Sequence, residues 1–199
     1  MSLLVGVLSI GEGHTRSRFM AVEPALVPGD ASDRGPSSSD PLFTLDAGFD
    51  PATWDGIVIH HSGGMFADEA SLDRLHRRLG SPDGITHHFL IGNGMGVDEG
   101  VIAITDRWNR QRPGVHVGGA AGAWHNQRSI SICLVGDGDE RPFSRDQIQS
   151  LASLVRRLQA ACEIPAERVR LAREVAGSDA VSSPGGYFPV ATFREQLLP

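Results

Sequence analysis

The sequence predicts a single α/β domain in which helices flank a mixed central β-sheet. Three observations lead to this prediction. Short runs rich in β-branched residues indicate buried strands, and segments with apolar residues at helical spacing alternate with them. The turn Gly92-Asn93-Gly94 joins two of these runs into a hairpin. Strands that alternate with helices around one hairpin form a layered domain with a mixed sheet.

Each element has its own signal. Strands are expected at 56–61, 85–91, 97–104, 130–135 and 169–171. A first helix is expected over 68–79, where three leucines share one face and a glycine follows. A longer helix starts at Ser144, which can form a capping box with Gln147, and keeps one apolar face as far as Leu158. A closing helical turn is expected over 192–197.

Residues 1–50 are expected to form a leader or linker, and residues 51–199 the folded domain. The stretch 24–41 is rich in proline, glycine and serine, a composition that buries too little apolar surface to offset its ordering entropy. The apolar run at 3–10 is well short of the ~18 residues that span a bilayer, and no basic residue precedes it. There is no strong membrane signal, and the run is either a remnant of a signal or anchor or a flexible start.

The charge argues against a nucleic-acid ligand. The chain has 18 basic and 24 acidic side chains and a formal net charge of −6, whereas non-specific nucleic-acid binding depends on many Lys and Arg contacts to phosphates. A glycan or peptide ligand fits better. Cys133 and Cys162 are expected to be buried thiols, and the sequence leaves open whether they pair.

Histidines are the most telling residues of the chain, which has eight of them. Two adjacent pairs, His60-His61 and His87-His88, lie on expected strands, and His116 lies in a glycine-flanked loop. Neighbours on a strand face opposite sides, so one member of each pair can point into a shared site while the other packs behind it. Such a site suits Zn²⁺, which binds neutral imidazole. The alternative is that each histidine is a surface or core-edge residue.

A series of motifs follows this pattern in a fixed order. In sequence order they are 57–64 (IVIHHSGG), 87–91 (HHFLI), 92–94 (GNG), 114–119 (GVHVGG), Asn126 with 129–137 (SISICLVGD), 173–175 (REV) and 183–185 (SPG). Together they resemble the motifs of the type 2 N-acetylmuramoyl-L-alanine amidases and the peptidoglycan recognition proteins. The resemblance covers roughly residues 54–197 and implies the fold of that family.

The resemblance also implies a zinc-dependent hydrolase that cuts the amide between the lactyl group of N-acetylmuramic acid and L-alanine. The first zinc ligand of the family falls on His60. The second falls on Ala172, which cannot bind a metal ion. The third falls on Ser183, or on Asp179 if a short insertion precedes the Pro-Gly pair. His87 stands where the family has a tyrosine that assists catalysis.

These correspondences define the candidate site residues. His87 and His116 are the catalytic candidates, and His60 with Asp179 form an incomplete set of metal ligands. The candidate substrate contacts are His61, His116, Asn126 and Trp124. For these residues loop capping, turn hydrogen bonds and ordinary packing are the alternative roles.

Three functional hypotheses remain open. The first is a module that recognises peptidoglycan or muropeptide, with lost or weakened hydrolysis and without a required cofactor. The second is an active zinc amidase of cell-wall turnover that uses His60, Asp179 and either His87 or His116. The third is a structural domain that has lost both activities. A peptidoglycan partner implies a cell-envelope, periplasmic or secreted location.

Overall fold

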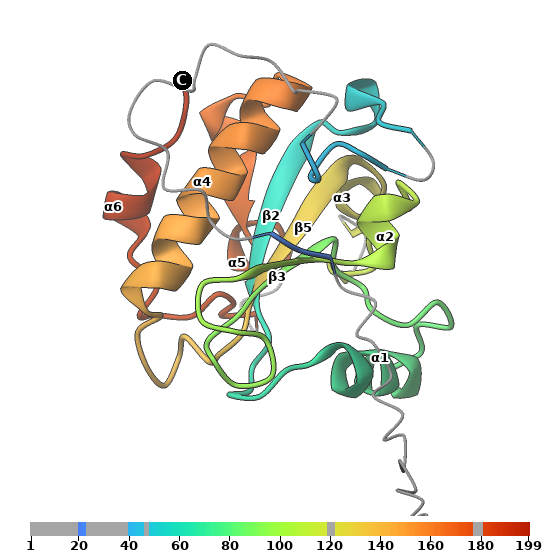
Figure 1. Cartoon of the computed structure of the whole chain (residues 1–199). Helices are drawn as coiled ribbons and strands as arrows, with labels where there is room; N and C mark the ends of the chain where they lie inside the picture. The colour runs from blue at the N-terminus through green and yellow to red at the C-terminus, as the bar shows by residue number, and fades with distance from the viewer. Residues whose placement is uncertain (1–19, 23–39, 46–47, 119–121, 177–180) are drawn as a thin grey trace, which may run out of the picture.

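The chain folds into a six-stranded mixed sheet flanked by helices, as the sequence predicts (Figure 1). The computed structural model describes residues 20–22, 40–45, 48–118, 122–176 and 181–199. The strands are β1 Met20–Val22, β2 Gly56–His61, β3 Phe89–Ile91, β4 Ile102–Ile104, β5 Ser129–Leu134 and β6 Val169–Leu171. The helices are α1 Glu69–Arg78, α2 Asp106–Asn109, α3 Gly122–Arg128, α4 Arg145–Cys162, α5 Ala172–Val175 and α6 Val190–Arg194.

The strands are parallel in one half of the sheet and antiparallel in the other half. The strand order is β1-β4-β3-β5-β2-β6. β3, β5, β2 and β6 run parallel, whereas β4 is antiparallel to both β3 and β1. In the β2–β5 pair, Gly56 lies opposite Ser129 and His61 lies opposite Leu134. The carboxyl ends of β2 and β5 therefore meet at the same edge of the sheet.

The two faces of the sheet differ in character. One face packs against α4, and Figure 1 shows α4 alongside the sheet with α6 on its outer side. This core contains Ile57, Ile59, Ile130, Ile132, Leu151, Leu154, Val155 and Leu158. The other face carries Val58, His60 and Ser131, and we call it the histidine face. α1 packs on that side through Leu72, which shares a cluster with Leu90 of β3.

Side-chain caps begin the two longest helices where the sequence places them. Asp68 accepts the backbone N–H of Ser71 at 2.7 Å and starts α1. Ser144 and Gln147 form the predicted capping box of α4. The Gln147 side chain also donates to the carbonyl groups of Ile91 (3.2 Å) and Val135 (2.9 Å). It thus ties the start of α4 to the ends of β3 and β5.

Several elements differ from the sequence prediction. β4 begins only at Ile102, because turns with positive φ at Gly94, Gly96 and Gly100 occupy much of the connection. β3 begins only at Phe89, because the backbone groups of Ile85 and Thr86 bond to the side chains of Arg107 and His76. α3 and α5 were not predicted, since a glycine-rich loop precedes the first and the second is a single turn. α6 begins at Val190, before the predicted turn at 192–197.

Part of the expected leader belongs to the fold. Leu42 is 1% exposed and lies in the α4-side core. The indole N–H of Trp108 donates to its carbonyl oxygen at 2.8 Å. Asp40 pairs with Arg157 of α4 at 2.5 Å, and β1 extends the sheet beside β4. These contacts could not be predicted from the sequence, because the preceding stretch is rich in proline, glycine and serine.

The cysteines match the expectation of buried thiols. Cys133 and Cys162 are both buried and free, and burial raises the pKa of each to about 12. Neither thiol is therefore a nucleophile at neutral pH. Within the described part of the chain, none of the helices has the length and apolarity needed to cross a membrane.

Candidate functional site

Four histidines gather on the histidine face. His60 extends from β2, His87 lies just before β3, and His116 lies in the loop before α3. His60 Nε2 is 3.1 Å from His116 Nδ1, and the ring centres of His60 and His87 are 5.2 Å apart. His76 of α1 adds a fourth ring, 5.4 Å from His87. The structure thus brings together three residues that the sequence singled out and one that it did not.

These imidazoles are neutral at physiological pH. Burial holds the pKa of His60 and His87 well below the ordinary value, and neighbouring imidazoles lower it further. Burial lowers the pKa of His116 to about 3, and a backbone contact with Ser129 offsets part of the shift. Among the described residues, His116 Nε2 has no hydrogen-bond partner although it is buried. The face offers neutral donors and acceptors rather than fixed charges.

The pair His87-His88 divides between the histidine face and the core. His88 is fully buried, and its ring lies 4.8 Å from that of Trp54. Its Nε2–H donates to the Arg112 carbonyl at 2.9 Å, and its Nδ1 accepts the Ser131 N–H at 2.8 Å. His87 instead contacts Ser131 Oγ at 2.7 Å. Ser131 has no exposed surface, so this contact orients His87 and does not make a serine nucleophile.

Asn126 holds the loop that carries His116. Its Oδ1 accepts the backbone N–H groups of His116 and Val117, each at 2.9 Å. Its Nδ2 donates to the Val117 carbonyl, also at 2.9 Å. The side chain that the sequence suggested as a substrate contact therefore positions His116, with one amide hydrogen left over.

The tryptophans near this loop have different surroundings. Trp124 of α3 is 49% exposed and packs edge-on against His125, with ring centres 4.9 Å apart. It remains available to stack on a sugar ring. Trp108 has no exposed surface and belongs to the core. Only Trp124 of these two can contact a ligand directly.

The positions that correspond to the other family ligands lie close by. Ala172 is 3% exposed and packs in an apolar cluster with Val58, Val117 and Val175. The Ser183 hydroxyl accepts the backbone N–H of His61 at 2.9 Å. Asp179, the other candidate for the third ligand, lies outside the described residues.

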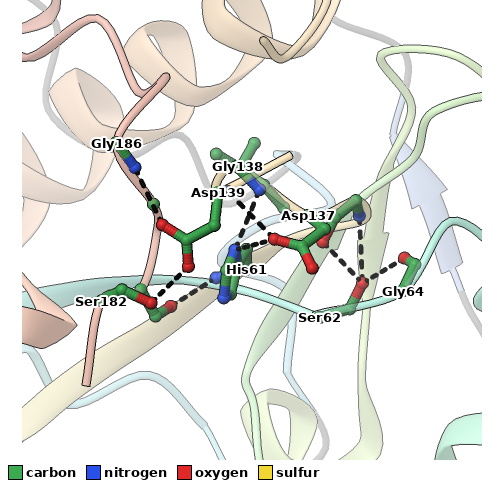
Figure 2. A network of polar contacts seen from close by, with 12 residues as sticks. His61, Ser62, Gly64, Asp137, Gly138, Asp139, Ser182 and Gly186 are labelled. Atoms are coloured by element: carbon green, nitrogen blue, oxygen red, sulfur yellow. Dashed lines mark hydrogen bonds and ion pairs between the residues drawn. The ribbon is translucent and has the colours of Figure 1, made fainter. Parts of the chain in front are cut away.

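His61, the neighbour of His60 on β2, takes part in a polar network at the carboxyl edge of the sheet (Figure 2). Its Nδ1 accepts the Gly138 N–H at 3.0 Å and lies 3.6 Å from Asp137 Oδ1. Asp139 accepts bonds from the Ser182 hydroxyl and from the Gly186 N–H. These bonds, the Ser182 bond foremost, lower the pKa of Asp139. In the sequence, the Gly136-Asp137 pair after β5 signals this network. The sequence prediction gave the pair no role at the site.

His61, Asp137 and Asp139 also form a group that could hold a metal ion. Among the described residues, it alone brings three possible ligand atoms within 4.8 Å of one another. However, the Nδ1 lone pair already accepts the Gly138 N–H, and both Asp139 oxygens accept bonds. All three side chains already bond within the protein, so the group serves as a structural network in this conformation.

A small cavity of about 90 Å³ lies between α1 and α2. Arg77, Arg107 and Arg112 line it together with acidic side chains. Arg107 is 6% exposed and donates to the carbonyl groups of Ile85 (2.8 Å) and Pro113. Its main role is to tie together the two segments that flank the histidine cluster.

The model of the N-acetylmuramoyl-L-alanine amidase family matches residues 50–186, well over half of the chain. The chain belongs to this amidase family. The matched range includes every candidate site residue named above. A comparison with the curated proteins finds no match.

Solved structures with the same fold include both amidases and recognition proteins. The endolysin amidase LysCS from Clostridium intestinale has a TM-score of 0.60 and 24% identity over 73% of this chain and 84% of its own. Wild-type PGRP-LB of Drosophila has a TM-score of 0.52 and 20% identity over 74% and 84%. The complex of the PGRP-LCa and PGRP-LCx ectodomains with tracheal cytotoxin has a TM-score of 0.50 and 17% identity over 70% and 81%.

At these identities the neighbours establish the amidase and recognition-protein fold. The family match supports a peptidoglycan-related function for this chain. The amidase family is often zinc-dependent, so the residues at its ligand positions decide which activity the site supports.

Proposed function

We propose that this amidase-family chain recognises peptidoglycan fragments and has lost or weakened hydrolysis. The observation that carries the proposal is Ala172. It stands at the second zinc-ligand position that the family resemblance implies, and it offers no donor atom. Valine side chains fill its surroundings. The site therefore keeps the fold of the family but offers no donor atom at this ligand position.

The residues present do not fit a zinc ion at the family positions. A catalytic zinc is typically held by three protein ligands and keeps a fourth position for water, which it activates. Here His60 Nε2 faces His116 at hydrogen-bonding distance, and the Ser183 hydroxyl faces the β2 backbone. Only one imidazole remains of the implied ligand set among the described residues, and one imidazole holds zinc weakly.

The histidine face suits the uncharged amide and hydroxyl groups of a glycopeptide. Burial keeps the rings of His60, His87 and His116 uncharged, and His116 Nε2, which has no partner among the described residues, can bond to an amide or hydroxyl group of a ligand. Trp124 offers an exposed aromatic face on α3, the helix that carries Asn126. The structure of recognition proteins bound to tracheal cytotoxin supports a ligand of this kind for the fold.

One observation favours a second candidate function, an active zinc amidase with a rearranged ligand set. The 3.1 Å between His60 Nε2 and His116 Nδ1 is close to the roughly 3.3 Å that separates two donors on a tetrahedral zinc ion. In this second candidate, His60, Asp179 and either His116 or His87 would hold the zinc ion. The two candidates make opposite predictions about zinc content.

The deciding experiment measures zinc and ligand binding on the same purified protein. We expect less than stoichiometric zinc, muropeptide binding by calorimetry that a chelator leaves unchanged, and no released stem peptide by mass spectrometry. We expect His116→Ala to weaken binding about tenfold or more, whereas Gln149→Ala, an exposed change on α4 behind the sheet, leaves it unchanged. Stoichiometric zinc with chelator-sensitive cleavage would establish the amidase instead.

A further inference from the structure

Two loops meet at the carboxyl edge of the sheet. The first loop follows β5 and contains Gly138 and Asp139. The second spans residues 182–187 and carries Ser183, which lies at the implied third ligand position. Figure 2 shows Asp139 between Ser182 and Gly186, with His61 and Asp137 beside it. We call the contacts of Asp139 with Ser182 and Gly186 the edge latch.

The two loops approach each other more closely than side chains would allow. A methyl group added to Gly138 would lie 1.9 Å from the Pro184 carbonyl oxygen, and one added to Gly185 would lie 2.0 Å from the backbone of Gly138. Gly185 also has φ +98°, which favours glycine. The Tyr187 N–H donates to the Gly138 carbonyl at 2.8 Å. The loops therefore pack backbone against backbone.

Ser183 lies at the centre of the segment that the latch spans. Its hydroxyl accepts the His61 N–H, and its carbonyl oxygen accepts the Arg173 N–H, each at 2.9 Å. Arg173 also donates to the Gly185 carbonyl at 2.7 Å, on the α5 side of the loop. Asp139 holds the other side, through the Ser182 hydroxyl and through the Gly186 N–H at 3.1 Å.

We propose that Asp139 is a positioning residue: it holds the 182–187 loop and, through the bond between Ser183 and the His61 N–H, keeps the end of β2 with His60 in position for muropeptide binding. The inference rests on the proposed recognition function. Asp139 does not touch the ligand in this account and acts only through the loop. Because Arg173 and the bond from the Tyr187 N–H to Gly138 still hold the loop, loss of the Asp139 carboxylate loosens the segment around Ser182 and Gly186 without unfolding the domain.

The first test follows the loop without any ligand. Ser183→Cys introduces a thiol there, and both native thiols are buried. With Asp139→Ala added, we expect its alkylation rate and the exchange rate of the Gly186 amide to rise about tenfold. Asp139→Asn keeps an oxygen acceptor and should give an intermediate rise. Glu140→Ala, which removes the next and exposed carboxylate of the same loop, is the matched control.

The second test measures muropeptide affinity and melting temperature in the chain with Ser183 intact. We expect Asp139→Ala to weaken binding at least about threefold, Asp139→Asn less, and both to melt within a few degrees of Glu140→Ala. Exchange rates equal to those of Glu140→Ala overturn the inference, as does faster exchange with unchanged affinity. Absence of binding by the unaltered chain overturns the proposed recognition function instead.

Discussion

At the scale of single residues, the ring of His88 is held in one neutral form because both of its nitrogens are bonded to the backbone. Burial lowers its pKa to about 3, against roughly 6.5 in an unfolded chain. Between these values the unfolded chain binds the additional proton. The stability that neutral His88 contributes is therefore complete above about pH 6.5 and is lost as the pH falls toward 3.

This difference can be measured by urea unfolding. We expect the free energy of unfolding to fall between pH 6.5 and pH 4, at up to roughly 1.4 kcal/mol per pH unit from His88. His88→Gln should be less stable at neutral pH but fall less steeply, because glutamine does not titrate. Equal slopes for the two proteins would show that His88 is not the group responsible.

Ala172 and Val117 share one apolar cluster, which limits how easily a zinc site could be restored there. We expect Ala172→His with Ser183→Cys to restore zinc binding only weakly, since Val117 occupies the space beside the new imidazole. Adding Val117→Ala should raise zinc affinity by orders of magnitude over the unaltered chain, measured by competition with a chromogenic chelator. Ser183→Cys with Val117→Ala alone is the control. No gain in the triple variant would mean that His60 cannot turn from His116 toward the ion.

At the scale of elements, the start of α4 holds the ends of two strands. The Gln147 side chain is 2% exposed and donates to carbonyl groups of Ile91 and Val135. We expect Gln147→Ala to lower the free energy of unfolding by about 2 kcal/mol, because it leaves these carbonyl groups without that donor. Gln149→Ala on the exposed side of the same helix should change it by less than about 0.5 kcal/mol. Similar losses in both variants would contradict this role.

Elements with strong local signals were predictable from the sequence. The run that forms β2 and the capping box of α4 are local features, and the structure has them at the predicted places. α3 and β1 could not be predicted in this way. α3 follows glycines that favour a loop, and β1 exists through pairing with β4, a contact distant in sequence.

At the scale of the whole molecule, the order of the motifs predicted the family and the fold. It also placed His60, His116 and Ala172 in one region, because each motif has a known position in that fold. Other features depend on packing that no motif reports. The enclosure of Ala172 by Val117 and the core position of Leu42 arise from contacts between distant segments.

The alternation of side chains along β2 has a consequence for how this domain can change. His60 lies on the histidine face and His61 lies in the edge network, yet they are consecutive in one strand paired on both sides. A single-residue insertion or deletion ahead of them would shift the strand and exchange their faces. Such a change would displace the histidine face and the loop anchorage together, so we expect length changes to be tolerated in the connections around this strand and not within it.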